Sequence, residues 1–309
     1  FYRCKLSLRW IVILGGISMA YYIVLLFSKI FCWLPDTFGK WLGNGLGRWI
    51  GRLLWPFVPE KRKKIARENV QRCLQVDTAE SERIAKASAV RFGPMLFEVL
   101  RFPVIRDKIA EYVEIEGIEN MREGLALGRG GIIATAHSGN WELLGGALAL
   151  AGFPIVGVAM KQKEAAMDRF INEYRRMMGM HITYKSDVRE MYQLLKKGWV
   201  IGLLMDQDVS PKDAALLDFF GQPTNCVQGP ASLARFKDAP IFPVFITQRA
   251  NGRHRLVIHP PVFVERTGDK HADIRKTTQI LTKIIEEHIR LYPEEWFWLH
   301  DRWKSIRED

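Results

Sequence analysis

The chain begins with a long stretch of apolar residues. Residues 10–34 read WIVILGGISMAYYIVLLFSKIFCWL and carry no charge before Lys29. About 20 apolar residues suffice to cross the hydrocarbon of a bilayer, so this stretch predicts an N-terminal membrane helix. Its length and the lack of a small-residue cleavage site argue against a cleaved signal peptide. Basic residues flank both ends, which leaves open a single span and a deeply embedded monotopic helix.

Residues 35–58 continue with large apolar side chains at helical spacing, interleaved with Lys40, Arg48 and Arg52. This aromatic and cationic pattern favours a helix at the bilayer surface, and an ordinary amphipathic helix packed on the domain is the alternative. The next segment, EKRKKIARENVQRC, predicts a basic helix. Such a helix can meet anionic head groups or a negatively charged carrier protein, or it can simply be solvated.

Beyond Pro59 the hydrophobic pattern alternates between short strands and amphipathic helices. The predicted strands are residues 112–118, 131–136, 155–160, 181–184, 200–205, 241–247 and 255–259. The predicted helices are residues 61–76, 79–101, 141–151, 164–178, 188–197, 230–236 and 272–291. Strands separated by helices of this length predict an α/β fold with a largely parallel sheet that helices cover on both faces.

The domain organisation follows from the same pattern. The chain shows no internal repeat, no Ser-rich linker and no second α/β unit. A length of 309 residues allows one large α/β domain with a substantial core. We therefore expect membrane-anchoring and interfacial helices over residues 1–58 and a single α/β domain over residues 59–309.

Charge and cysteine content narrow the partners and the compartment. The chain has 45 Lys and Arg against 34 Asp and Glu, a formal charge of +11 that favours an acidic partner. No zinc-finger, RNP-type or basic-zipper pattern is present, so an anionic lipid or an acidic protein is favoured over nucleic acid. The four cysteines have no paired spacing, which indicates reduced thiols in a cytosol-facing protein.

The run ATAHSGNWELLGG contains the best candidate for chemistry. His137 follows a predicted buried strand, and Glu142 falls in the first turn of the next helix. Ligands collect at the carboxyl edge of strands in open α/β sheets. A carboxylate that holds one imidazole nitrogen leaves the other free to take a proton from a hydroxyl. The alternative is a hydrogen-bonded structural histidine with a glutamate that favours the helix dipole.

Further motifs, in this order and separation, make the chain resemble a known family over nearly its whole length. The chain resembles the bacterial lipid A late acyltransferases (the lauroyl and myristoyl transferases) and the related phosphatidylinositol mannoside acyltransferases. The motifs are His137-x4-Glu142, Tyr174-Arg175 with Gly179, Met205-Asp206-Gln207-Asp208, Asp218-Phe219-Phe220-Gly221, Gly229-Pro230-Ala231 and the segment from Pro293 to His300.

The resemblance implies a glycerolipid-acyltransferase-like fold and an O-acyltransferase that moves a fatty acyl chain from a thioester donor to a glycolipid hydroxyl. His137 would be the general base oriented by Glu142, and Arg175 would stabilise the oxyanion together with backbone amides near Gly139 and Asn140. The implied donor is acyl carrier protein, the acceptor is a lipid A precursor, and no cofactor is needed. The implied location is the cytoplasmic face of a bacterial inner membrane.

Other polar residues are candidates for substrate binding. Asp206, Gln207 and Asp208 follow an apolar strand, so we expect them on the same sheet edge as His137, where they position the acceptor head group or hold Arg175. The remaining candidates are Asn140, Lys161 and His300. Two close carboxylates with no third ligand give no metal site. A different glycolipid acceptor, an acyl-coenzyme A donor and a non-catalytic lipid-binding scaffold remain as alternatives.

Overall fold

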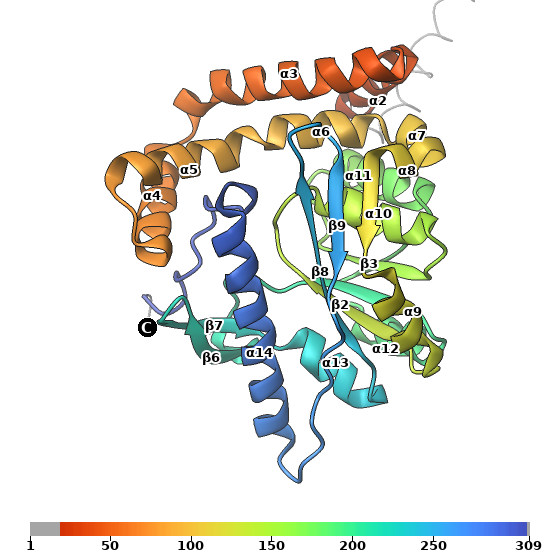
Figure 1. Ribbon diagram of the computed structural model, residues 1–309, viewed down its shortest axis with the longest axis vertical. Helices are drawn as coiled ribbons and strands as arrows, with labels where there is room; N and C mark the ends of the chain where they lie inside the picture. Colours follow the sequence, from red (N-terminus) through yellow and green to blue (C-terminus); the bar gives the residue numbers. More distant parts are fainter. Residues whose placement is uncertain (1–18, 308–309) are drawn as a thin grey trace, which may run out of the picture.

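The computed structural model describes residues 19–307. Its N-terminal part is helical throughout. The helices are α2 (Met19–Trp33), α3 (Asp36–Leu54), η1 (Trp55–Phe57), α4 (Glu60–Leu74), α5 (Thr78–Val90), α6 (Phe92–Leu100), α7 (Phe102–Ile105), η2 (Arg106–Lys108) and α8 (Ile109–Tyr112). Helices and strands then alternate, and one large sheet is built from strands between residues 113 and 258 (Figure 1).

The main sheet has seven strands in the order β1-β9-β8-β2-β5-β3-β4. They are β1 (Val113–Glu116), β2 (Gly131–Thr135), β3 (Ile155–Ala159), β4 (His181–Tyr184), β5 (Val200–Leu204), β8 (Ile241–Gln248) and β9 (His254–Ile258). Every neighbouring pair is parallel except β8 with β9. All seven predicted strands are therefore confirmed, and so is the mostly parallel α/β sheet.

Helices cover both faces of this sheet, as predicted (Figure 1). They are α9 (Ile118–Ala126), α10 (Trp141–Leu150), α11 (Ala165–Met177), α12 (Val188–Lys196), α13 (Gly229–Lys237) and α14 (Lys270–Leu291). Successive side chains of a strand point to opposite faces. Accordingly, Ile132 joins a core with residues of α12, α13 and α14, whereas Ile133 joins one with residues of α10 and α11.

The first described helix packs against the α/β body. Tyr21 of α2 is buried, and its hydroxyl donates to Glu173 Oε2 at 2.6 Å. Ser28 donates to Leu100 O at 2.6 Å and is also hydrogen-bonded to the Tyr174 hydroxyl. Among the described helices, none combines the length and apolar character that a membrane crossing requires. The predicted membrane segment starts at residue 10, and its first nine residues lie outside the described part.

Helix α3 packs on α6 through glycine rather than through its large apolar residues. Gly39, Gly43 and Gly47 are the buried positions of α3. A Cβ on Gly47 would lie 2.6 Å from Pro94 N and 2.7 Å from Gly93 C, so only glycine allows this approach of the two backbones. The opposite face of α3 leaves Trp41 and Trp49 exposed. The packing of α3 on the domain is therefore confirmed, whereas its location at a bilayer surface stays a prediction.

The single helix predicted over residues 79–101 is wrong, because the chain breaks at Arg91 into α5 and α6. Pro94 has no N–H and cannot donate to the carbonyl of Val90, which lies four residues earlier. A turn at Arg91 results. This break carries the Arg91 side chain toward the end of β2, where it takes part in the site described below.

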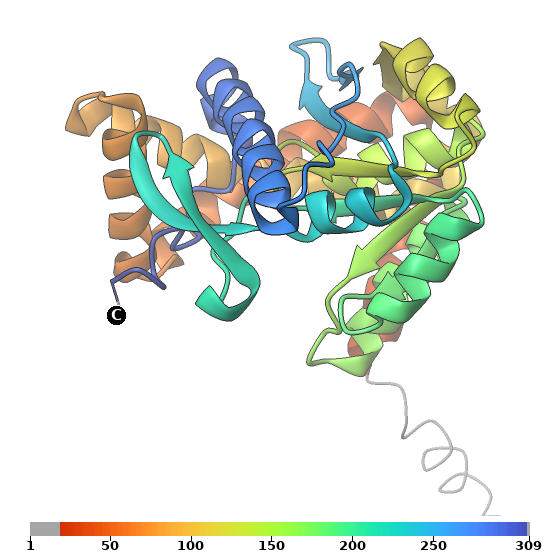
Figure 2. The ribbon, with the colours of Figure 1, turned by 90° about the horizontal axis from the view of Figure 1, so that it is seen from below.

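Two further strands form a separate antiparallel hairpin that the sequence pattern did not predict. They are β6 (Ala214–Phe219) and β7 (Gln222–Val227), preceded by η3 (Pro211–Asp213). Figure 2 shows the hairpin extending from the body beside the C-terminal segment. Arg302 of that segment is buried and donates to Asn225 O at 2.7 Å. The hairpin therefore holds the segment around Arg302 against the domain.

Candidate functional site

His137 lies two residues beyond the end of β2, in a turn that leads into α10. Gly139 in this turn has φ +60°, and a Cβ there would overlap Ile246 O, so the turn requires glycine. The side chain of His137 is 24% exposed, and its ring packs edge-on against Trp141 at 5.1 Å between centroids. The imidazole is thus held by the fold but remains accessible.

Asp206 is the carboxylate that contacts this imidazole. Its Oδ1 lies 2.9 Å from His137 Nδ1, and its Oδ2 accepts from Trp296 Nε1 at 2.7 Å. Burial by itself would raise the pKa of Asp206, but the charge and hydrogen bond of His137 and the bond from Trp296 outweigh it and hold that pKa below its usual value. An ionised Asp206 only accepts hydrogen bonds, so Nδ1 carries a proton and Nε2 is the ring nitrogen whose lone pair can take one from a substrate.

The register of the sheet explains this pairing. Thr135 at the end of β2 is paired with Leu204 at the end of β5. His137 and Asp206 each lie two residues further on, so the parallel strands deliver them to the same edge. The expected location of Asp206 is confirmed. The prediction that it holds Arg175 is corrected, since its carboxylate binds His137 and Trp296.

Glu142 binds Arg175 instead of His137. Arg175 Nε donates to Glu142 Oε2 at 2.7 Å, and Nη2 donates to Oε1 at 2.6 Å. The prediction that Glu142 orients the imidazole is corrected here, because both of its carboxylate oxygens face the guanidinium from the first turn of α10. Burial would lower the pKa of Arg175, but the hydrogen bond and charge of Glu142 raise it above its usual value. Arg175 Nη1 also donates to Asn172 Oδ1 at 3.0 Å.

The backbone of the His137 turn is held by groups from distant parts of the chain. Arg91 Nη1 donates to Gly139 O at 2.6 Å, and Nη2 donates to His137 O at 3.4 Å. Gly139 N donates to Glu295 O at 3.0 Å, so this amide is not free to bind an oxyanion as predicted. Phe297 N donates to His137 O at 3.1 Å. Burial lowers the pKa of Arg91 to about 10, against an opposing effect of Glu295, so the guanidinium stays charged at neutral pH.

Asn140 caps α10 and lies in a buried polar network. Its Oδ1 accepts from Leu143 N at 3.0 Å, and its Nδ2 donates to Glu98 Oε2 at 2.6 Å. Glu98 Oε1 is 2.7 Å from His254 Nε2. Burial would lower the pKa of His254, but Glu98 outweighs this and raises it. Both ends of the Asn140 amide are used within the protein, which favours a positioning role over the predicted contact with substrate.

Ser138 is turned away from the site. Its hydroxyl lies 2.9 Å from Nε2 of His288, and the His288 ring stacks on Phe245 at 4.1 Å. Burial, with a smaller contribution from His259, lowers the pKa of His288 to about 3. His288 is therefore neutral at ordinary pH, and its hydrogen bond with Ser138 helps to hold the His137 turn in place.

The other candidate substrate-binding residues fall into two groups. Asp208 accepts from Ser305 N at 3.0 Å and from Ser305 Oγ at 2.7 Å, and its own N–H donates to His300 Nε2 at 3.0 Å. Burial lowers the pKa of His300, in keeping with a neutral acceptor nitrogen. Asp208 and His300 thus fasten the C-terminal segment near His137. Gln207 is half-buried, and Lys161 lies exposed on the loop after β3; their roles stay predictions.

Apolar surface accompanies the free side of His137. Phe92 contacts Trp141 at 5.8 Å and Phe297 at 5.0 Å between ring centroids, and all three rings are partly exposed. No group of three or more His, Cys, Asp or Glu side chains within residues 19–307 is arranged to hold a metal ion. The site therefore offers a histidine–aspartate pair, a neighbouring Arg–Glu pair and an aromatic wall.

Sequence reasoning found His137, Asp206 and Arg175 but missed several residues that support them. Trp296 lies in the terminal aromatic motif, so its segment was recognised while its hydrogen bond to Asp206 was not. Arg91 precedes the Phe-Gly-Pro interruption of a helix, and that proline was the available signal. Glu98 and His254 gave no signal along the sequence, since they are 156 residues apart.

Comparison with known proteins finds a matching family and several similar acyltransferases. The model of the family described as bacterial lipid A biosynthesis acyltransferase matches residues 15–305. A phosphatidylinositol mannoside acyltransferase from Mycolicibacterium smegmatis is 26% identical over 250 residues, which cover 79% of this chain and 80% of that protein. A lipid A biosynthesis lauroyltransferase from Escherichia coli K12 is 26% identical over 255 residues, 81% of each chain.

One further relative and one solved structure are also similar to this chain. A lipid A biosynthesis palmitoleoyltransferase from Escherichia coli K12 is 25% identical over 254 residues, again 81% of each chain. Among solved structures, the 1-acyl-sn-glycerophosphate acyltransferase PlsC from Thermotoga maritima matches 78% of this chain and 96% of its own, with 15% identity and a TM-score of 0.36.

Proposed function

Because the chain belongs to the bacterial lipid A biosynthesis acyltransferase family and is an O-acyltransferase, we propose that it moves a fatty acyl chain from acyl carrier protein to a hydroxyl of a lipid A precursor. The observation that carries this proposal is the His137–Asp206 pair, with Nδ1 bound at 2.9 Å and the ring partly exposed. Within residues 19–307, no hydrogen-bond partner occupies the other ring nitrogen.

In the proposed reaction, His137 Nε2 accepts the proton of the acceptor hydroxyl while the hydroxyl oxygen forms a bond to the thioester carbonyl carbon. The carbonyl π pair moves to oxygen and forms a tetrahedral oxyanion. This oxyanion then reforms the carbonyl and breaks the carbon–sulfur bond, and the imidazolium returns the proton to the leaving thiolate. Asp206 supports the imidazolium throughout, because its ionised carboxylate holds Nδ1–H.

Arg175 supplies the proposed stabilisation of the oxyanion. A guanidinium has five N–H groups, and the hydrogen bonds to Glu142 and Asn172 use one on each of its three nitrogens. One N–H on each terminal nitrogen is left for an incoming oxygen. Glu142 holds this guanidinium in place, which gives the residue a positioning role in the same reaction.

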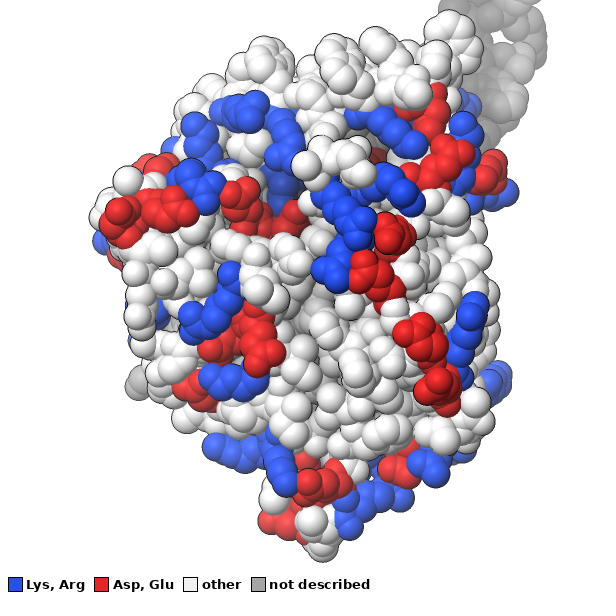
Figure 3. Space-filling model, viewed as in Figure 1, with Lys and Arg blue, Asp and Glu red and all other residues white. Residues whose placement is uncertain are grey.

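Membrane binding is the second part of the proposal. The outer face of α2 and α3 exposes Trp33 (85%), Trp41 (69%) and, after the turn, Phe57 (79%). Figure 3 shows an uncharged ridge where α3 lies, with Lys and Arg side chains directly below it. Aromatic side chains above a cationic band suit the interface of an anionic bilayer. We place the protein on the cytoplasmic face of the inner membrane, where a glycolipid acceptor would reach His137.

The test offers purified protein a set of acyl carrier proteins with different acyl chains, together with a tetra-acylated lipid A precursor. Mass spectrometry of the product identifies the donor, the chain and the position. We expect transfer in the wild type and a loss of roughly 10²–10⁴-fold in His137→Ala, the usual contribution of a general base. Thermal unfolding of the variant serves as the control for folding.

Other outcomes would assign a different function. Undiminished transfer by a folded His137→Ala protein would contradict the proposed base. Transfer only to phosphatidylinositol mannosides, or only from acyl-coenzyme A, would keep the chemistry and change the substrates. No transfer from any donor would favour the non-catalytic lipid-binding scaffold.

A further inference from the structure

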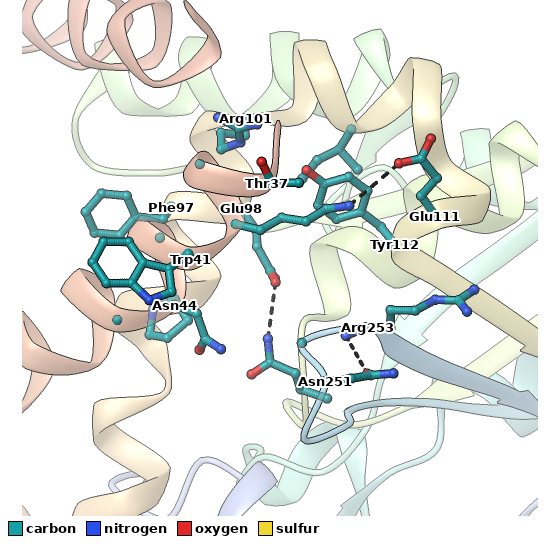
Figure 4. A pocket seen from close by; sticks show the side chains of 18 of the residues that line it. Thr37, Trp41, Asn44, Phe97, Glu98, Arg101, Glu111, Tyr112, Asn251 and Arg253 are labelled. Carbon is teal, nitrogen blue, oxygen red and sulfur yellow. Dashed lines mark hydrogen bonds and ion pairs between the residues drawn. The ribbon is translucent and has the colours of Figure 1, made fainter. Parts of the chain in front are cut away.

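A cavity of about 950 Å³ lies between α3, α6, α8 and the turn that joins β8 to β9 (Figure 4). Trp41, Asn44 and Phe97 line one side, and Asn251 and Arg253 line the other. His137 is not among the residues that line it. The cavity is thus separate from the transfer centre.

Two arginines of this cavity carry charges that no carboxylate neutralises within the described residues. Arg48 Nε donates to Asn44 Oδ1 at 3.0 Å, and its Nη2 donates to Gln248 Oε1 at 3.0 Å. Arg253 Nη2 donates to the carbonyl of Ala110 at 3.1 Å. All these acceptors are neutral, so both guanidinium groups keep their full charge and several free N–H groups.

The remaining charged groups of the wall leave an excess of positive charge. Lys40, Arg48, Arg101 and Arg253 line the cavity together with the carboxylates of Glu98 and Glu111, and Asp36 pairs with both Lys40 and Arg101 at 3.0 Å. Glu98 is bound by His254 at 2.7 Å and by Asn140 at 2.6 Å, and Glu111 lies 3.8 Å from Lys40. An anion that enters the cavity would therefore meet Arg48 and Arg253 without displacing an internal ion pair.

The mouth of the cavity is open and borders the apolar face of α3. Gly45 lines it, and a Cβ placed on Gly45 would meet no atom within 4 Å. Trp41 stands at the same rim and is exposed. Fork-shaped guanidinium groups bind phosphate oxygens well, and an exposed tryptophan suits the glycerol and upper acyl region of a lipid. This combination fits an amphiphile with a phosphate better than a fully soluble anion.

The cavity also has a structural path to the His137 turn. It adjoins a smaller pocket of about 50 Å³ that shares Arg48, Glu98 and Gln248 with it and is also lined by Gly139 and Asn140. Gln248 accepts from Arg48 and donates to Glu98 Oε1 at 3.5 Å, and Glu98 in turn holds Asn140. A ligand bound to Arg48 is therefore three side chains away from the cap of α10.

We infer that this cavity is a second lipid site that binds the anionic phosphate head group of a membrane lipid through Arg48 and Arg253. The phosphate oxygens accept from guanidinium N–H groups that the protein leaves unused, and the rest of the lipid leaves past Gly45 and Trp41 toward the bilayer. The proposed acyl transfer is not needed for this binding, since His137 and Asp206 are elsewhere.

The test measures binding of short-chain lipids by calorimetry. Dihexanoyl phosphatidic acid is the anionic probe, dihexanoyl phosphatidylcholine the zwitterionic one, and glycerol 3-phosphate the soluble ester. We expect phosphatidic acid to bind best and its affinity to fall about tenfold or more for each of Arg48→Gln and Arg253→Gln. Arg275→Gln, which changes an exposed arginine on α14, is the matched control and should bind like the wild type.

A second pair of variants tests the location without changing charge. Gly45→Phe should fill the mouth and reduce binding of phosphatidic acid at least tenfold, whereas Gly45→Ala should leave the mouth open and binding intact. Unchanged binding of phosphatidic acid to Gly45→Phe, or to the double variant Arg48→Gln/Arg253→Gln, would overturn the proposed site. Glycerol 3-phosphate that binds as tightly as the lipid would overturn the lipid assignment. His137→Ala should bind normally, which separates this test from that of acyl transfer.

Discussion

The imidazole of His137 takes its orientation from a carboxylate 69 residues further along the chain. At the scale of single residues, the site consists of two hydrogen-bonded pairs with different tasks. Asp206 is buried, ionised and shared between His137 and Trp296. Glu142, which is only 7% exposed, is committed to Arg175. Replacing either carboxylate should therefore change a different property of the protein.

Asp206→Asn should lower the transfer rate by roughly 10²–10⁴-fold and disturb the His137 tautomer, because an amide no longer demands a proton on Nδ1. Glu142→Gln should leave the tautomer unchanged and lower the free energy of unfolding by about 3 kcal/mol, because Arg175 loses its buried partner. Ring nitrogen NMR shifts report the tautomer, and urea unfolding reports the stability. A changed tautomer in Glu142→Gln, with Asp206→Asn normal, would return the orienting role to Glu142.

At the scale of elements, the contact of α3 with α6 is the most constrained helix packing beside the site. It depends on the absence of side chains at buried glycines, whereas the neighbouring Gly45 is free of contact. The glycines of this helix therefore have two different structural roles. One kind permits the approach of two backbones, and the other only weakens the helix.

Gly47→Ala should lower the free energy of unfolding by about 1–3 kcal/mol, because its Cβ would lie 2.6 Å from Pro94 N and the helices must separate. Gly45→Ala should raise it by up to about 1 kcal/mol, since alanine is the better helix former and meets no neighbour. Denaturant unfolding of both variants in the same detergent checks this pair. Equal effects of the two substitutions would mean that α3 does not pack closely on α6.

At the scale of the whole molecule, the edge formed by α2 and α3 is apolar. The C-terminal segment packs elsewhere, against the His137 turn. The helices α2 and α3 lie together along the top of the molecule in Figure 1, and the ridge at the top of the same view in Figure 3 is uncharged. Trp49 and Phe57 are exposed on it. In the proposed membrane-bound orientation, α3 and the cavity beside it would both face the bilayer.

The double variant Trp49→Ser/Phe57→Ser should bind vesicles of phosphatidylcholine and phosphatidylglycerol at least about tenfold more weakly, because two aromatic side chains no longer enter the interface. Leu216→Ser changes another exposed apolar residue, which lies on β6, and should bind like the wild type. Co-sedimentation with vesicles measures both. Equal loss in the two proteins would show that the face formed by α2 and α3 has no special role in membrane binding.

How far the site could be predicted is clear from individual residues. The ends of β2 and β5 were recognisable as apolar runs followed by polar residues, so His137 and Asp206 were expected at one sheet edge. The choice of partner was wrong, because closeness along the chain favoured Glu142, whereas the register of the sheet brings Asp206 to the ring. The break at Arg91 had a local signal in Pro94 that was overlooked, whereas the hydrogen bond from Gly139 N to Glu295 O depends on packing between distant segments.

By itself the sequence determined the alternation of seven strands with helices, the parallel sheet and the edge that carries the candidate chemistry. These features depend on local periodicity and on the short reach of turns, which a sequence displays directly. Only the tertiary structure decided which carboxylate serves His137, which face of α3 is buried and that two unpaired arginines share one cavity. Each of these is a contact between segments far apart in the chain, and no pattern of neighbouring residues encodes such a distance.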